Sequence, residues 1–183
     1  MMSLNAKRSF DTMLERAVRA SLQLTADDPV YLEPIAHVDQ IAAEYMVIVS
    51  VSSYFFRLQL MVYFTADDAS RKHLASVHAV DMAAMDAAAF EDAIRECANR
   101  CCGSLGRELA QVFPHIGMST PNIVDRRCAQ HLDLLDAAHQ QHVRLAVAQG
   151  AEFHVSLRVN AFEDLDFVVP QPAQQNTGEL EMF

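Results

Sequence analysis

A period-2 alternation of apolar residues in two segments limits the possible folds of this chain more than any other feature. In each segment every second residue is apolar, at Phe56, Leu58, Leu60, Val62 and Phe64 and again at Phe153, Val155, Leu157 and Val159. Successive side chains of a strand point to opposite faces, so both segments predict strands with one apolar face. Such strands leave one face of their sheet in water. The pattern therefore favours an α+β fold with a mostly antiparallel, mixed sheet over a doubly wound parallel one.

Other segments supply weaker strand signals. Residues 45–51 are rich in β-branched side chains, and the short gap at Ser52 and Ser53 predicts an antiparallel hairpin with residues 56–64. Residues 118–124, around Pro121, predict a short extended segment, and residues 166–169 a last strand. The polar, histidine-rich segment 125–148 is only weakly periodic and predicts no definite element.

Two long amphipathic helices are expected to cover the apolar face of the sheet. Residues 4–24 and 90–112 both carry apolar side chains at intervals of three and four, and the second helix should end near Pro114 and Gly117. The buried stripe expected for the second helix comprises Phe90, Ile94, Cys97, Ala98, Cys101, Leu105, Leu109 and Val112. Between them, Thr65 stands three residues before Asp68 and predicts the capped start of a shorter helix.

Length and composition point to a single domain. The 183 residues suit one core, which we place in residues 1–170, and the Pro- and Gln-rich residues 171–183 predict a flexible C-terminal tail. We expect a cytoplasmic protein without a membrane segment, because no apolar run is long enough to span a bilayer and the N-terminus lacks a signal-peptide core. The net charge of −10 argues against nucleic-acid binding.

Several kinds of chemistry find no support in the motifs. Cys128, His131, His139 and His142 have a spacing that superficially resembles zinc ligation, but the glycine knuckles of such sites are absent, so we expect no metal site. Cys97, Cys101 and Cys102 crowd one helix without a CxxC motif, which indicates buried, reduced thiols. The chain also lacks the glycine-rich loops that bind nucleotides and the GxSxG motif of hydrolases.

The polar face of the second long helix is unusual. It collects Asp92, Glu96, Asn99, Arg100 and Gly103. Glycine in a helix costs about 0.5–1 kcal/mol relative to alanine, and asparagine is a poor helix former. A close-approaching partner would explain both choices. The alternative is an ordinary surface on which Glu96 pairs with Arg100 one turn later.

These residues resemble a known signature. Asp92, Glu96 and Asn99, with Gly103 and a downstream Pro121, are similar to the D/S-x3-E-x2-N motif of the CheC/CheX/FliY phosphatases of bacterial chemotaxis. The segments VYFTADDASRKHLA before the helix and HIGMSTPNIV after it also resemble parts of CheX-type proteins. The similarity extends over residues 42–124, and a single ExxN block points to the CheX type with its CheC-like fold.

The resemblance implies an enzyme that removes the phosphoryl group from the aspartyl phosphate of a CheY-like response regulator. By this similarity Asn99 would orient the attacking water, and Glu96 would pair with the active-site lysine of the regulator. Asp92, Arg100 and Gly103 would then contribute to partner docking. Magnesium would belong to the regulator, with no cofactor in this chain, and a homodimer is a further expectation. The alternatives are a CheC-like module that binds or assembles without catalysis, and a chance match in an unrelated α+β domain.

Overall fold

A seven-stranded antiparallel sheet forms the centre of the computed structural model, which describes residues 1–24, 30–132, 136–147 and 150–169. The strand order is β1-β6-β7-β3-β2-β4, and β5 also pairs with β2. All strand pairs are antiparallel, and the predicted hairpin is confirmed, with Val49 opposite Leu60. The strands are β1 Tyr31–Pro34, β2 Tyr45–Ser52, β3 Phe56–Phe64, β4 Gly117–Met118, β5 Asn122–Asp125, β6 His139–Ala146 and β7 Glu152–Ala161.

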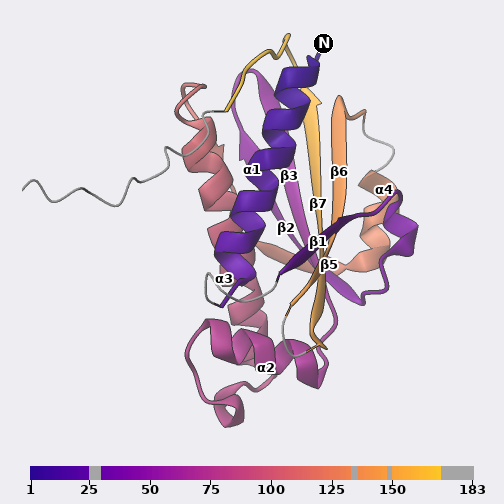
Figure 1. Cartoon of the computed structure of the whole chain (residues 1–183), viewed down its shortest axis with the longest axis vertical. Helices are drawn as coiled ribbons and strands as arrows, with labels where there is room; N and C mark the ends of the chain where they lie inside the picture. The colour runs from indigo at the N-terminus through magenta and orange to yellow at the C-terminus, as the bar shows by residue number, and fades with distance from the viewer. Residues whose placement is uncertain (25–29, 133–135, 148–149, 170–183) are drawn as a thin grey trace, which may run out of the picture.

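Two long helices, α1 (Leu4–Leu22) and α3 (Ala87–Leu109), lie side by side across one face of the sheet, with α2 (Asp68–Val77) at one end of the pair (Figure 1). Each long helix starts at a side-chain cap, since the Ser3 hydroxyl accepts a hydrogen bond from the Ala6 amide and the Asp86 carboxylate accepts one from Ala89. Their apolar stripes meet the inner side chains of the sheet in one core. The predicted α+β fold with two helices on one face is confirmed.

The topology repeats itself within the chain. The first half runs α1, β1, β2, β3, and the second runs α3, β5, β6, β7. The counterparts are β1 and β5, β2 and β6, and β3 and β7. When each strand is exchanged for its counterpart, the order β1-β6-β7-β3-β2-β5 becomes the same order read from the opposite edge of the sheet. The central pair β3 and β7 joins the two halves. Helices α1 and α3 therefore occupy equivalent places in the two halves.

The second face of the sheet is less exposed to water than the alternation predicts. Met61 and Tyr63 point to that face and are almost fully buried, in a small apolar cluster with Ile41, Met46 and Ala129. Two short segments, η1 (Val38–Gln40) and the turn η3 (Arg126–Cys128) with α4 (Ala129–Leu132), lie by this side of the sheet. The prediction of a solvated face is therefore wrong for this part of the sheet, because Met61 and Tyr63 are amphipathic or apolar residues that accept burial.

Several boundaries differ from the sequence predictions. Helix α2 is capped by Asp67, whose carboxylate accepts from the Ser70 amide, and not by Thr65. Residues 166–169 form no strand; their neighbour Leu165 makes only an isolated bridge with Met2. The histidine-rich segment contains a full strand, β6.

Two further expectations concern the ends of the elements. Val112 lies beyond the end of α3 and is 38% exposed, so it does not belong to the buried stripe. The predicted tail at residues 171–183 lies outside the described residues. Within the described part of the chain, no helix combines the length and apolarity needed to cross a membrane.

Candidate functional site

Helix α3 presents the predicted motif on a rigid element. Seven members of the predicted stripe are buried, namely Phe90, Ile94, Cys97, Ala98, Cys101, Leu105 and Leu109, and this fixes the rotation of the helix about its axis. With about 100° between successive residues, the opposite side must face outward. The stripe therefore determines which way the motif side chains point.

The outward side carries the residues that the sequence singled out. Asp92 and Glu96 are exposed, whereas Asn99 is half-buried at the edge of the same face. Glu96 and Asn99 are three residues apart, so they are neighbours on the helix surface. Within the described ranges, neither side chain makes a hydrogen bond or an ion pair. A carboxylate and a carboxamide are thus displayed together.

Gly103 adds free space one turn beyond Asn99. A Cβ atom built there would meet only the Arg107 guanidinium, at 3.7 Å, in ordinary van der Waals contact. No core residue in the described part of the molecule requires the missing side chain. The glycine instead lowers the helix surface next to Asn99, where another molecule could approach the backbone.

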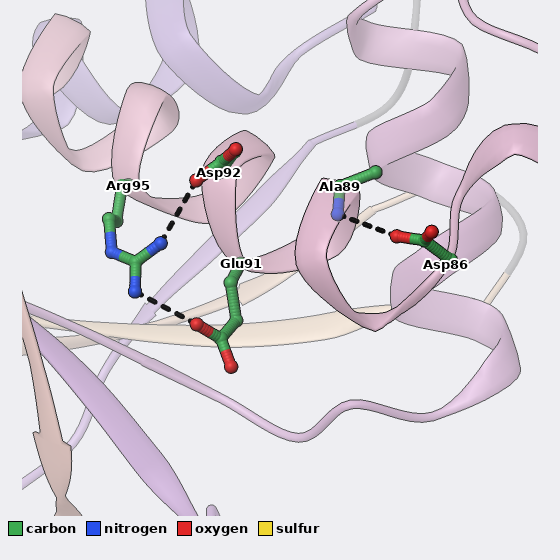
Figure 2. Close-up of polar contacts among 5 residues, drawn as sticks. All are labelled: Asp86, Ala89, Glu91, Asp92 and Arg95. Carbon is green, nitrogen blue, oxygen red and sulfur yellow. Dashed lines mark hydrogen bonds and ion pairs between the residues drawn. The ribbon is translucent and has the colours of Figure 1, made fainter.

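The two arginines nearest to Glu96 on α3 are already engaged. Arg100 does not pair with Glu96; its Nη2 donates to the carbonyl oxygen of Ala20, at 3.2 Å, near the end of α1. Figure 2 shows Arg95 between two carboxylates, with Nη2 2.8 Å from Glu91 and Nη1 3.0 Å from Asp92. Asp92 is thus partly neutralised, and Glu96 remains the acidic group of this face without a cation partner among the residues described.

The three cysteines of α3 are packing residues. Burial raises the pKa of the Cys97 thiol to about 12, with Arg100 opposing and Glu96 supporting the shift. Burial likewise raises the pKa of Cys102 to about 12 and that of Cys101 further. All three thiols are protonated at neutral pH, so none is an activated nucleophile. The interpretation of these cysteines as buried thiols is confirmed.

Two of the four residues with zinc-like spacing make other contacts. His139 Nε2 lies 2.5 Å from the Asp11 carboxylate, and His142 Nδ1 lies 2.6 Å from the Ser156 hydroxyl. Cys128 is exposed on η3. Across the ranges that the structure describes, no three His, Cys, Asp or Glu residues gather as metal ligands would.

Pro121 lies between β4 and β5, where the edge of the sheet is interrupted. On one side Val51 and Ser52 pair with β4, and on the other residues 45–48 pair with β5. The Ser119 amide donates to the Ser50 carbonyl oxygen across this interruption. Proline has no N–H to give to a ladder, so an edge suits it. The position at the sheet edge is therefore enough to account for Pro121, and no catalytic role is needed to explain it.

The equivalent helix α1 does not repeat the motif. Asp11, Glu15 and Val18 have the sequence spacing of Asp92, Glu96 and Asn99. They do not share one outward face, because Val18 is fully buried and Asp11 contacts His139. Of the two long helices, α3 is therefore the one that displays a glutamate and an asparagine together on its outer side.

Comparison with solved structures identifies the type of fold. No protein-family model and no curated protein matches the sequence. Among structures, CheX from Vibrio vulnificus aligns with a TM-score of 0.61 at 14% identity, over 82% of this chain and 99% of that one. A CheX-CheY-BeF3-Mg complex from Borrelia burgdorferi aligns at 0.58 and 11%, over 84% and 96%. A CheC-like superfamily protein from a Shewanella species aligns at 0.57 and 10%, over 87% and 100%.

The protein therefore has the CheC-like fold, in which CheX-type chemotaxis proteins are built. The sequence resemblance is confirmed at this level, since the similar structures span nearly their whole length. Identities of 10–14% establish the fold alone. What the site on α3 does must be argued from its own residues.

Proposed function

We propose that this protein is a phosphatase that removes the phosphoryl group from the aspartyl phosphate of a CheY-like response regulator in chemotaxis signalling. The observation that carries the proposal is the outward display of Glu96 and Asn99 beside Gly103, on the one helix of the symmetric pair that has the full motif. The CheC-like fold supports it, because one of the similar structures is a CheX-CheY complex.

The proposed hydrolysis requires few catalytic groups from this chain. Hydrolysis of an aspartyl phosphate requires a water molecule in line with the phosphorus and stabilisation of the charge on the transferring group. In our proposal the Asn99 carboxamide enters the active site of the regulator and orients that water. The regulator supplies the magnesium ion and the phosphorylated aspartate. No activated thiol or metal of this chain is involved.

Glu96 has a separate role in the proposal. Its carboxylate pairs with the active-site lysine of the regulator and so fixes the position of α3 on the partner. Arg100 is held by Ala20 and Arg95 by Glu91 and Asp92, so a partner cation would meet little competition for Glu96. Such charge pairs contribute to specificity and association as well as to affinity.

A time course of phosphate loss tests the proposal against the alternative of a CheC-like module without catalysis. Purified CheY-like receiver domains from the same organism are phosphorylated with acetyl phosphate, and loss of the phosphoryl group is followed with and without this protein. We expect substoichiometric amounts to accelerate the loss for at least one receiver. A protein that binds a phosphorylated receiver but leaves its phosphate loss at the spontaneous rate would be the non-catalytic module.

A further inference from the structure

An open groove adjoins the motif. It has a volume of about 400 Å³ and lies between α3 and the segment that joins α2 to α3. Its apolar lining includes Val80, Ala84, Met85 and Ala89, and the carboxyl-bearing residues Asp92 and Glu96 stand at its side. The groove therefore shares Asp92 and Glu96 with the candidate catalytic face.

The walls of the groove are held by specific contacts. Arg71 donates from Nη1 to the carbonyl oxygen of Met85, at 3.1 Å, and stacks over the Phe90 ring at 5.2 Å from its centroid. The Asp81 carboxylate accepts from the Ala83 amide and so caps the short helix η2 (Met82–Ala84). Because these contacts lie within the chain, the groove is formed before any partner binds.

The turn after α2 holds one residue, Ala79, in an unfavourable backbone conformation. The amides of Ala79 and Val80 donate to the carbonyl oxygens of Ser76 and Ala75, which is the pattern of a Schellman motif. This motif places Ala79 at a φ of 52°, a region that favours glycine. The turn leaves Val80 46% exposed, and Met82 is 42% exposed. A rigid segment thus displays apolar side chains that the described core does not use.

The carboxylates around the groove favour a partner surface that carries a positive charge. Asp92 and Glu96 line it, and Asp81 and Asp86 flank in sequence the segment that carries Ala84 and Met85. Two arginines lie nearby: Arg71 holds the wall through the Met85 carbonyl oxygen, and Arg95 pairs with Asp92. Glu96 is left without a cation partner among the residues described. His78 lines the groove and directs Nε2 toward Cys97 at 3.5 Å. An apolar side chain flanked by lysine or arginine would match both the lining and the rim.

We infer that this groove receives an apolar side chain, with a basic residue beside it, from the receiver domain that presents its aspartyl phosphate to Asn99. The inference rests on the proposed function and deepens it. Glu96 belongs to both surfaces, so one approach of the partner would fill the groove and bring the carboxamide into position. The groove then governs which receiver is bound, whereas Asn99 governs how fast the bound receiver is hydrolysed.

A matched pair of substitutions on η2 tests this division. Ala84 and Ala83 are neighbouring exposed alanines, and Ala84 lines the groove while Ala83 is absent from its lining. Binding to a receiver domain activated with beryllofluoride and magnesium is measured by titration, and kcat and KM by phosphate loss. We expect Ala84→Lys to weaken binding and raise KM at least about tenfold with kcat unchanged, and Ala83→Lys to bind within about twofold of wild type.

The outcomes separate failure of the inference from failure of the proposed function. If Ala84→Lys binds as tightly as wild type while Asn99→Ala still abolishes hydrolysis, the groove inference is wrong and the phosphatase stands. Equal weakening by both lysine variants would indicate a general charge effect and contradict a groove. If Ala84→Lys changes the oligomeric state in light scattering, the groove belongs to a second copy of this chain. If the wild-type protein neither binds nor dephosphorylates any receiver, both proposals fail.

Discussion

Arg100 donates a hydrogen bond to the carbonyl oxygen of Ala20, at 3.2 Å, instead of pairing with Glu96 one turn earlier on the same helix. The bond ties the middle of α3 to the end of α1. It also removes the cation that would otherwise neutralise Glu96. The sequence left open an ordinary surface pair between Glu96 and Arg100, and this geometry leaves the carboxylate available to a partner.

Glu96→Gln should impair partner binding with little effect on stability. The side chain is exposed and makes no hydrogen bond or ion pair within the described chain, so its loss costs nothing internal. We expect KM for the phosphorylated receiver to rise roughly tenfold, because one charge pair across an interface is lost. Glu15→Gln is the control, since Glu15 is an exposed glutamate on the other long helix, α1, outside the motif. An equal rise in KM for Glu15→Gln would contradict a specific role for Glu96.

Gly103→Ala should make the protein more stable and less active. The added Cβ meets only Arg107 at 3.7 Å, so the helix gains about 0.5–1 kcal/mol of stability in urea unfolding. We expect KM to rise because the partner can no longer come as close. Gly106→Ala, which also has open space, should stabilise equally and disturb activity less, since Gly106 lies about 10 Å from Asn99 along the axis and Gly103 about 6 Å. An unchanged KM for Gly103→Ala would contradict a close approach of the partner to the helix backbone at Gly103.

Ala79→Gly should stabilise the turn that borders the groove. The φ of 52° at Ala79 strains an L side chain, and glycine removes that strain. We expect the free energy of unfolding to increase by up to about 1 kcal/mol. Ala88→Gly in the first turn of α3 should instead lower it, because helical backbone there needs no positive φ. Destabilisation by Ala79→Gly would show that the turn adopts another conformation in solution.

Stability should fall as the solution becomes mildly acidic, in part because of His154. Burial lowers the pKa of this histidine from its ordinary value of 6.5, with Arg144 acting in the same direction and Glu152 opposing. The folded state then binds fewer protons than the unfolded state below pH 6.5, so stability is complete above that value and is lost as the pH falls.

Urea unfolding at about pH 7.5 and about pH 5.5 measures this loss. His154→Gln should lose less stability between the two values than wild type does. His131→Gln, at an exposed position on α4, should behave like wild type. An identical pH dependence for His154→Gln and wild type would exclude His154 as a contributor.

Sequence periodicity correctly predicted the helices and strands whose inward-facing residues are uniformly apolar. The strand over 56–64 and the stripe of α3 were clear because their inner residues are uniformly apolar. Strand β6 was missed because Gln141 and His142 are partly buried there, which hides the alternation of Val143 and Leu145. A tertiary contact, the hydrogen bond between His142 and Ser156, makes the burial of the histidine acceptable.

The motif residues could be selected from sequence, but their surroundings could not. The polar stripe and the costly Gly103 were visible as a pattern. The bond from Arg100 to Ala20 and the groove beside Glu96 depend on how α1, α2 and α3 are placed relative to one another. The equivalence of α1 and α3 likewise follows only from the order of the strands in the sheet.

The most direct test of the central claim is the rate of phosphate loss from a saturated receiver, compared between wild type and Asn99→Ala. Alanine is the better helix former, so the variant should be at least as stable as wild type and should bind the receiver with similar affinity. We predict that kcat falls about 100-fold, because the water loses its orienting group. Asn5→Ala, at an exposed position of α1, should leave kcat unchanged. A variant Asn99→Ala that hydrolyses the bound aspartyl phosphate at the wild-type rate would contradict the proposed mechanism.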